Sequence, residues 1–179
     1  KDVHSGSIKG SNILLPEEWS LINGYLIGPD ANLRGAALTG TDLTGLNLTN
    51  ADLTYAKLTG VNLTGANLTN TMLGQVDMTN ANLTNANLKN VRSNDIKGTN
   101  ITLPENWFIL NGHLIGPGAN LKKADLRGTN LAGANLTGAD LTDAILIGVN
   151  LKGANLSGAD LSYVNLKGAD LTDANVDKT

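Results

Sequence analysis

Apolar residues recur at every fifth position through most of the chain. Leucine holds this position from Leu33 to Leu88, with Met78 as the one replacement, and again from Leu121 to Leu171, followed by Val176. A small or β-branched residue usually stands two positions earlier, with Asn or Asp between them. A period of five fits neither the 3.6-residue period of a helix nor the two-residue period of a long strand. The recurring Gly and Asn residues disfavour a helix further, so the pattern excludes a helical protein.

Side chains alternate within one pentapeptide. The small residue and the leucine point to one face, and the Asn or Asp between them points to the other. The Gly or Asn that ends most units tolerates the positive φ of a tight turn. We therefore predict that each pentapeptide forms one very short strand and one turn, which together make one side of a polygon. The expected fold class is all-β.

These units resemble the repeats of the pentapeptide-repeat family. The motif is carried by stretches such as Ala51-Asp52-Leu53-Thr54, Ala66-Asn67-Leu68-Thr69-Asn70 and Ala134-Asn135-Leu136-Thr137-Gly138, and the match covers about two thirds of the chain. The resemblance implies a right-handed quadrilateral parallel β-helix, which is a solenoid with four pentapeptides in each coil.

A longer repeat of 88 residues (96 − 8) is superimposed on the pentapeptides. Ile8-Lys9-Gly10 recurs as Ile96-Lys97-Gly98, and Leu15-Pro16-Glu17 recurs as Leu103-Pro104-Glu105. This pattern indicates duplication of one module. We expect an N-terminal tail over residues 1–7, a first module over residues 8–95 and a second module over residues 96–179. The two modules should form one continuous solenoid.

The pentapeptide frame must shift between the two leucine series. Leu88 and Leu121 are 33 residues apart (121 − 88), which is not a multiple of five. Ile96 and Ile101 share the frame of the second series. We therefore place the shift near Val91 to Asp95.

Each module contains one segment that interrupts the pentapeptides, over about residues 14–30 and 102–118. In both segments two apolar runs flank an Asn-Gly pair, Asn23-Gly24 or Asn111-Gly112. Asn-Gly between apolar runs is a strong hairpin signal, because a type I′ turn needs positive φ at both central residues. We predict one inserted β-hairpin in each module.

The hairpin segments hold most of the aromatic residues. Aromatic side chains often anchor protein partners, and His113 occupies the place of Tyr25 in the second module. The candidate interaction residues are therefore Trp19, Tyr25, Trp107, Phe108 and His113. The alternative is that these side chains pack the hairpins against the coil or cover a coil end.

Outward side chains should form columns along the solenoid. With 20 residues in a coil, positions 20 apart stack at about 4.8 Å, the spacing of neighbouring strands. We expect the stacked amides of two columns to hydrogen-bond to one another along the axis, and these columns are Asn47, Asn67 and Asn87, and Asn135, Asn155 and Asn175. Asp140 and Asp160 form another column close to Asp143, so a weak divalent-cation site is an alternative to a solvated surface.

Composition narrows the range of partners. The chain has 13 Lys and Arg against 16 Asp and Glu, which gives no strong field for nucleic acid or an anionic membrane. No apolar run approaches the roughly 20 residues of a membrane helix. The absence of Cys excludes disulfides and thiolate metal sites. A start at Lys1 without Met favours export, to a bacterial periplasm or the thylakoid lumen, over the cytoplasm.

Catalysis needs titratable groups gathered in a concavity, and neither His4 nor His113 has an evident partner in the pattern. We therefore expect no enzyme, no catalytic residue, no metal and no cofactor. The leading hypothesis is a structural or interaction scaffold that binds a protein partner through extended solenoid surfaces. The partner and the oligomeric state stay open.

Two alternatives are weighed against the scaffold. Columns of Thr, such as Thr39, Thr59 and Thr79, suggest binding of ice or another regular surface. The family resemblance suggests inhibition or protection of a DNA-handling enzyme, because some members protect DNA gyrase by imitating duplex DNA. Those members are markedly acidic and dimerise through a C-terminal helical segment, whereas this chain is slightly acidic and still in repeat over residues 170–179.

Overall fold

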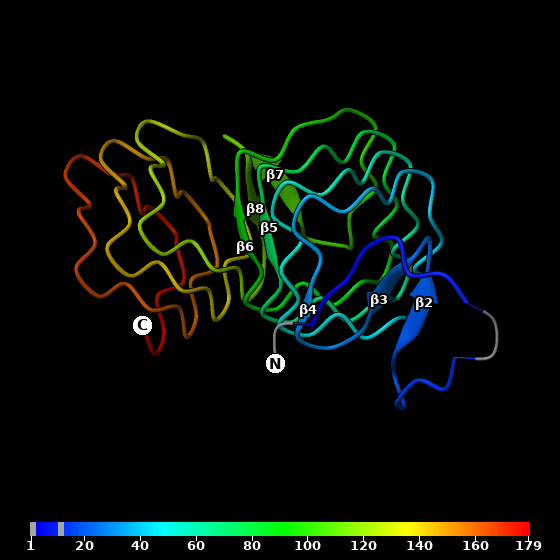
Figure 1. Cartoon of the computed structure of the whole chain (residues 1–179). Helices are drawn as coiled ribbons and strands as arrows, with labels where there is room; N and C mark the ends of the chain where they lie inside the picture. The colour runs from blue at the N-terminus through cyan, green and yellow to red at the C-terminus, as the bar shows by residue number, and fades with distance from the viewer. Residues whose placement is uncertain (1–2, 11–12) are drawn as a thin grey trace. The chain divides into compact units, whose positions relative to one another are not determined.

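One turn of the backbone takes 20 residues, as expected for a four-sided coil. Parallel bridges join residues 20 apart on all four sides of the first coil: Asn32↔Asp52, Ala37↔Lys57, Asp42↔Asn62 and Asn47↔Asn67. The computed structural model describes residues 3–10 and 13–179, and these contain no helix. The fold is an all-β, right-handed quadrilateral β-helix, and its coils are visible in Figure 1.

The chain divides into two units, Lys1–Glu105 and Asn106–Thr179. The structural division therefore follows Glu105, whereas the second copy of the sequence repeat begins at Ile96. Each unit builds its own stack of coils.

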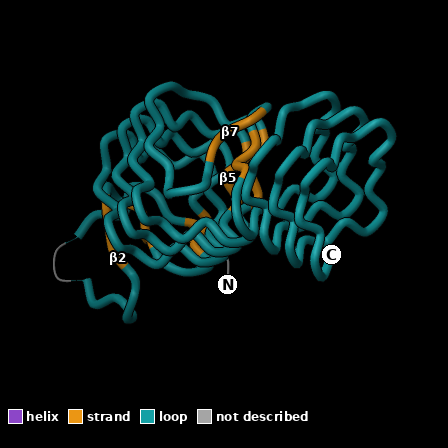
Figure 2. Tube along the Cα trace, turned by 180° about the vertical axis from the view of Figure 1, so that it is seen from behind, coloured by secondary structure: helices purple, strands orange, loops and turns teal. Residues whose placement is uncertain are grey.

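The sides of the coils are so short that Figure 2 shows most of them as loop, with strand at only a few places. Within the described residues, two strand pairs are parallel: β1 (Val3–His4) with β4 (Ala31–Asn32), and β5 (Met72–Gly74) with β6 (Arg92–Asn94). Two pairs are antiparallel: β2 (Ser20–Ile22) with β3 (Tyr25–Ile27), and β7 (Phe108–Leu110) with β8 (His113–Ile115).

Leucine and alanine fill the interior of the coils. Leu58 is completely buried, as is Ala66 on another side. At the corner after Leu33, its carbonyl accepts a hydrogen bond from the Ala36 N–H (3.0 Å), and the intervening Gly35 has φ 66°. Positive φ at the third residue is the requirement of a type II turn, which explains why Gly and Asn recur at this position.

Both hairpins form with the predicted turn. Leu21 pairs with Leu26 and Ile109 with Leu114. The turn residues have positive φ at both positions, 52° and 80° at Asn23-Gly24 and 50° and 76° at Asn111-Gly112, as a type I′ turn requires.

The predicted position of the frame shift is wrong. Lys97 bridges Asp77, and Thr102 bridges Asn82, so the first frame continues through residue 102. Two positions of every pentapeptide point inward, and Ile96 fits either one. Ser93 and Gly98 hold the places of the next two leucines, and these small residues concealed the continuation of the frame.

Residues 3–8 are not a free tail. Val3 pairs with Ala31, the buried Ser5 Oγ accepts a hydrogen bond from the Leu26 N–H at 2.6 Å, and the Ile8 N–H donates to the Gly24 carbonyl at 3.0 Å. Backbone pairing and one buried hydroxyl hold this polar segment, which is why hydropathy alone did not reveal its role.

An amide ladder exists, but in a different column from the predicted one. Asn67 lies above Asn87 as expected, yet the Asn67 Oδ1 accepts from the N–H and hydroxyl of Thr69 within its own turn. The ladder runs instead along the corners, where Asn70 Nδ2 donates to Asn50 Oδ1 at 2.9 Å and Asn90 Nδ2 donates to Asn70 Oδ1 at 2.6 Å.

Candidate interaction surface on the first unit

The coils of the first unit have four sides. Side A comprises residues 31–35, 51–55, 71–75 and 91–95, and sides B, C and D come after it in each coil. Positions 1 to 5 of a pentapeptide start from the small inward residue, so that position 3 is the central leucine.

Sides C and D carry the same polar turn in almost every coil. On side C, the Thr44 N–H and hydroxyl both donate to Asp42 Oδ1, at 3.0 and 2.6 Å. Asn62 with Thr64, Asn67 with Thr69 and Asn82 with Thr84 repeat this arrangement. Such an Asx turn satisfies an outward backbone N–H. The outward Thr and Asx side chains are therefore tied to one another in a uniform surface.

The same kind of hydrogen bond lowers the pKa of several aspartates. Donors two residues later lower the pKa of five of them below the ordinary value of 3.8, namely Asp42, Asp77, Asp125, Asp160 and Asp170. For a sixth, Asp52, partial burial raises the pKa, but hydrogen bonds from Thr54 and Arg34 outweigh it and the net shift is downward. These carboxylates are ionised and accept hydrogen bonds that hold the turns. A lowered pKa makes them poorly suited to acid–base catalysis near neutral pH.

Side A departs from this uniform surface. Position 2 is Met72 and Arg92 in successive coils, and position 4 includes Arg34 and Gly74. Arg34 forms an ion pair with Asp52 (3.3 Å), and its guanidinium lies 5.1 Å from the centre of the Tyr55 ring. An exposed cation–π contact of this kind contributes about 0.5–1 kcal/mol. Side A is therefore the side with the most varied chemistry.

The edge between sides A and B, which we call the A–B edge, holds bulky residues in a left-handed conformation. The other three edges of the first unit hold only Gly or Asn from residue 40 to residue 100, but this edge continues from Gly35 to Tyr55, Gln75 and Asp95, with φ of 64°, 55° and 51°. The corresponding edge of the second unit holds Lys123, Asp143 and Tyr163, also with positive φ. Positive φ costs a non-Gly residue about 1–2 kcal/mol, and such strain clusters at functional sites.

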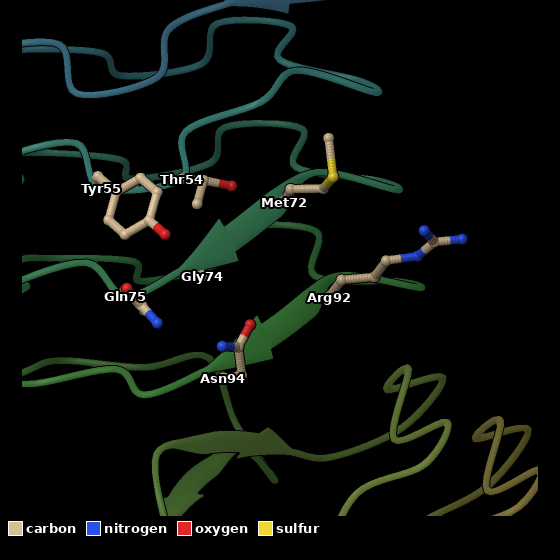
Figure 3. Close-up of a pocket in the computed structure, with 7 residues that line it drawn as sticks. All are labelled: Thr54, Tyr55, Met72, Gly74, Gln75, Arg92 and Asn94. Atoms are coloured by element: carbon tan, nitrogen blue, oxygen red, sulfur yellow. The ribbon is translucent and has the colours of Figure 1, made fainter.

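A shallow notch lies on side A at Gly74. It has a volume of about 190 Å³ and is lined by Thr54, Tyr55, Met72, Gly74, Gln75, Arg92 and Asn94. Figure 3 shows Thr54 and Tyr55 on one side of Gly74, Asn94 on the other, and Met72 and Arg92 extending outward. A Cβ atom at Gly74 would stand 2.8 Å from the Asn94 Oδ1. The missing side chain therefore creates the notch.

The aromatic residues of the first hairpin are held within its unit. The half-buried Trp19 ring lies against Gly28, where an added Cβ would approach it to 2.6 Å. The Tyr25 Oη accepts a hydrogen bond from the Ala37 N–H at 3.1 Å. In the next coil the equivalent N–H of Lys57 donates to the Ala36 carbonyl at 2.9 Å. Tyr25 thus supplies the acceptor that a preceding coil would otherwise provide.

The second hairpin is placed in a similar way. Trp107 and Phe108 pack against the buried core of the second unit, Trp107 lies against Gly116, and His113 is half-buried. These contacts favour the alternative in which the hairpins close a coil end. Binding of a partner by the five hairpin residues stays a prediction.

No metal-binding cluster emerges from the described residues. Asp140 and Asp160 do share a column, but residues 3–10 and 13–179 contain no group of three or more His, Cys, Asp or Glu side chains able to hold a metal ion. In the same part of the chain, no helix is long and apolar enough to span a bilayer.

The geometry defines a solenoid repeat protein in which side A of the first unit carries Met, Tyr and Arg side chains in place of the Asx–Thr pairs of sides C and D. The sequence model of the family described as pentapeptide repeats matches eight copies, over residues 30–65, 62–92, 119–158 and 146–177. The chain therefore belongs to the pentapeptide-repeat family. No curated protein sequence gives a significant match.

Solved structures include similar proteins. HetL, involved in heterocyst differentiation regulation in the cyanobacterium Nostoc sp. strain PCC 7120, is 31% identical over 82% of this chain and 62% of its own, with a TM-score of 0.33. Rfr23 from the cyanobacterium Cyanothece 51142 is 27% identical over 74% of this chain and 65% of its own, with a TM-score of 0.29. Full-length QnrB1, a plasmid-mediated fluoroquinolone resistance protein, is 19% identical over 83% of each chain, with a TM-score of 0.37.

This chain spans less than two thirds of the length of either cyanobacterial protein. The TM-scores are low, so these structures add no argument about function.

Proposed function

We propose that the protein is a non-enzymatic scaffold that binds a protein partner through side A and the A–B edge of the first unit. The observation that carries the proposal is that side A carries Arg34, Tyr55, Met72 and Arg92 where sides C and D carry a uniform Asx–Thr surface. Tyr, Met and Arg are enriched at protein interfaces. Sides C and D lack this combination.

The strained edge supports the same location. Tyr55 is 52% exposed with φ 64°, so burial of its side chain offers little to offset the backbone cost. Glycine at this position would avoid that cost, as it does at Gly35. A binding role for the exposed ring gives a physical reason for the presence of a tyrosine.

DNA mimicry has weaker support. Side A carries Arg34 and Arg92 together with Asp52 and Asp95, so its formal charges balance, whereas imitation of a duplex requires a strongly negative surface. A gyrase supercoiling assay distinguishes the two functions. Inhibition or protection at stoichiometric protein would favour mimicry over the scaffold.

Site-specific photo-crosslinking tests the proposal. A photoreactive amino acid is introduced at Thr54 on side A or, as the matched control, at Thr64 on side C, since both are position-4 threonines that are half-buried and follow an Asx residue. In the source organism, position 54 should yield a discrete crosslinked protein that position 64 does not. Equal products at both positions, or none at position 54, would contradict the proposal.

A further inference from the structure

The backbone N–H of Gly74 differs from its counterparts on the regular sides. In those turns the N–H at position 4 donates to the Asx side chain at position 2, and on side A the Thr54 N–H does so to Asp52 Oδ1 at 2.9 Å. At Gly74 the residue two positions earlier is Met72, which has no oxygen. The β5–β6 pair is parallel, the Arg92 N–H donates to the Thr71 carbonyl and the Gln75 N–H donates to the Asn94 carbonyl, and this register leaves the Gly74 N–H out of the ladder between the two strands. Among residues 3–10 and 13–179, no acceptor outside the β5–β6 pair meets it.

The surroundings of this N–H combine apolar side chains, the uncharged polar side chains of Thr54, Gln75 and Asn94, and one cation. Tyr55 and Met72 line the notch together with Gly74. Arg92 stands directly beside Met72 in the β5–β6 register, is exposed, and makes no ion pair within the described part of the chain. Arg34, by contrast, is neutralised by Asp52. The notch therefore offers an unused N–H donor and an unpaired guanidinium next to apolar surface.

We infer that the Gly74 notch binds an acidic side chain of the protein partner, an Asp or Glu carboxylate flanked by an aliphatic or aromatic residue. The carboxylate supplies the oxygen that Met72 lacks, so it accepts from the Gly74 N–H as Asp52 accepts from the Thr54 N–H. Arg92 balances its charge, and the neighbouring apolar side chain covers Tyr55 and Met72. This inference rests on the proposed function, because it assigns the chemistry of the partner on side A.

A carboxylate fits better than an amide of the same shape. Either group can accept from the Gly74 N–H, but only the carboxylate also attracts Arg92. Hydrogen bonds to an ionised group are roughly twice as strong as neutral ones. Discrimination between Asp and Asn at the same place is therefore the direct measure of the inference.

Two dipeptides provide that measure. The ¹⁵N-labelled protein is titrated with N-acetyl-Asp-Leu-amide and with N-acetyl-Asn-Leu-amide, and the amide resonances of Gly74, Gln75 and Asn94 are followed by NMR. The Asp probe should shift these three resonances selectively, with an affinity about tenfold higher than that of the Asn probe. Equal affinities, or shifts confined to other sides, would overturn the inference.

A pair of substitutions at one position provides the matched control. Met72→Asp gives Gly74 an intramolecular acceptor of the repeat type and should abolish binding of the Asp probe. Met72→Leu keeps the apolar wall without an acceptor and should retain binding within about twofold, since it preserves size and hydrophobicity. Thermal melts establish that both variants are folded. Retained binding in folded Met72→Asp refutes the assigned contact.

The two proposals fail separately. If position 54 crosslinks a partner but the Asp probe shows no preference over Asn, the scaffold function stands and the carboxylate inference falls. If the probe binds as expected and no crosslink forms at position 54, the site exists but the scaffold proposal for side A is wrong.

Discussion

The corner ladder of Asn50, Asn70 and Asn90 makes a measurable contribution to stability that the substitution Asn70→Gly isolates. Asn70 holds the central place, donating to Asn50 at 2.9 Å and accepting from Asn90 at 2.6 Å. Its φ of 60° is as acceptable to glycine as to asparagine. The substitution therefore removes two side-chain hydrogen bonds without forcing the backbone to move.

The loss of stability depends on how exposed the hydrogen bonds of the ladder are to solvent. A hydrogen bond contributes about 0.5–1.5 kcal/mol net, and exposed amides belong at the lower end of that range. Loss of both bonds should cost about 1–2 kcal/mol. The extra flexibility of glycine in the unfolded chain adds about 0.5–1 kcal/mol, so a control that shares this second cost is needed.

Asn85→Gly is that control. Asn85 lies at another corner of the same unit with φ 57°, but Gly65 stands 20 residues before it, so it has no amide partner in that coil. Urea unfolding of both variants should place Asn70→Gly about 1–2 kcal/mol below Asn85→Gly. For a chain of this size the difference in Tm should be about 5 °C. Equal stability of the two variants would refute the contribution of the ladder.

Four further predictions test the core, two glycine positions, the end of the first unit and the acid response. Urea unfolding should show that Leu58→Ala, at a completely buried site, lowers the free energy of unfolding by about 3 kcal/mol. Leu171→Ala, at a half-buried site, should lower it by about 1 kcal/mol. Equal losses would contradict the difference in burial. Gly98→Ala should cost about 3 kcal/mol by the same assay, because its Cβ would meet the Thr79 backbone N at 2.5 Å, while Gly65→Ala, with nothing within 4 Å, should cost only the 1–2 kcal/mol or so of positive φ. Tyr25→Phe should lower the free energy of unfolding by about 1 kcal/mol through loss of the acceptor for the Ala37 N–H, and no change would argue against the role of the hairpin in closing the coil. The six aspartates of lowered pKa bind fewer protons in the folded state than in the unfolded state, so their stabilisation is present above the ordinary pKa of 3.8 and is lost as the pH falls through the lower folded values. The Tm measured from pH 7 to pH 3 should therefore decline at the acid end. A rise of the Tm on acidification would contradict this sign.

The coil and its core were predictable because each depends on one-dimensional periodicity. Leucine at every fifth position can be buried on one side only if the chain turns once per pentapeptide, and the bridges between Asp42 and Asn62 confirm the 20-residue coil. The Asn23-Gly24 hairpin was predictable because its turn type depends on those two residues. These features need no knowledge of packing between distant segments.

The pentapeptide frame after Leu88 and the position of the amide ladder were harder to predict, because the local sequence pattern allowed two solutions for each. Ile96 fits both inward positions of a pentapeptide, and only its neighbours in the adjacent coil decide between them. Asn67 and Asn70 both recur every 20 residues, but Asn67 has a threonine two positions later that occupies its oxygen. The Asx-X-Thr spacing that occupies the Asn67 oxygen is visible in the sequence, and it favours Asn70 over Asn67 as the residue of the ladder.

The candidate site lies where the repeat is least regular, and its chemistry results from a departure at two positions in one pentapeptide. Loss of the Asx side chain at Met72 frees a backbone donor, and loss of the Thr side chain at Gly74 opens the space in front of it. Either change alone would leave an ordinary surface: with an Asx residue at position 72 the donor would be satisfied, and with a threonine at position 74 the notch would be filled. Together the two changes leave a turn whose position-4 N–H has no side-chain acceptor of its own. A carboxylate from the partner would supply the hydrogen bond that an Asx side chain makes in the other repeats.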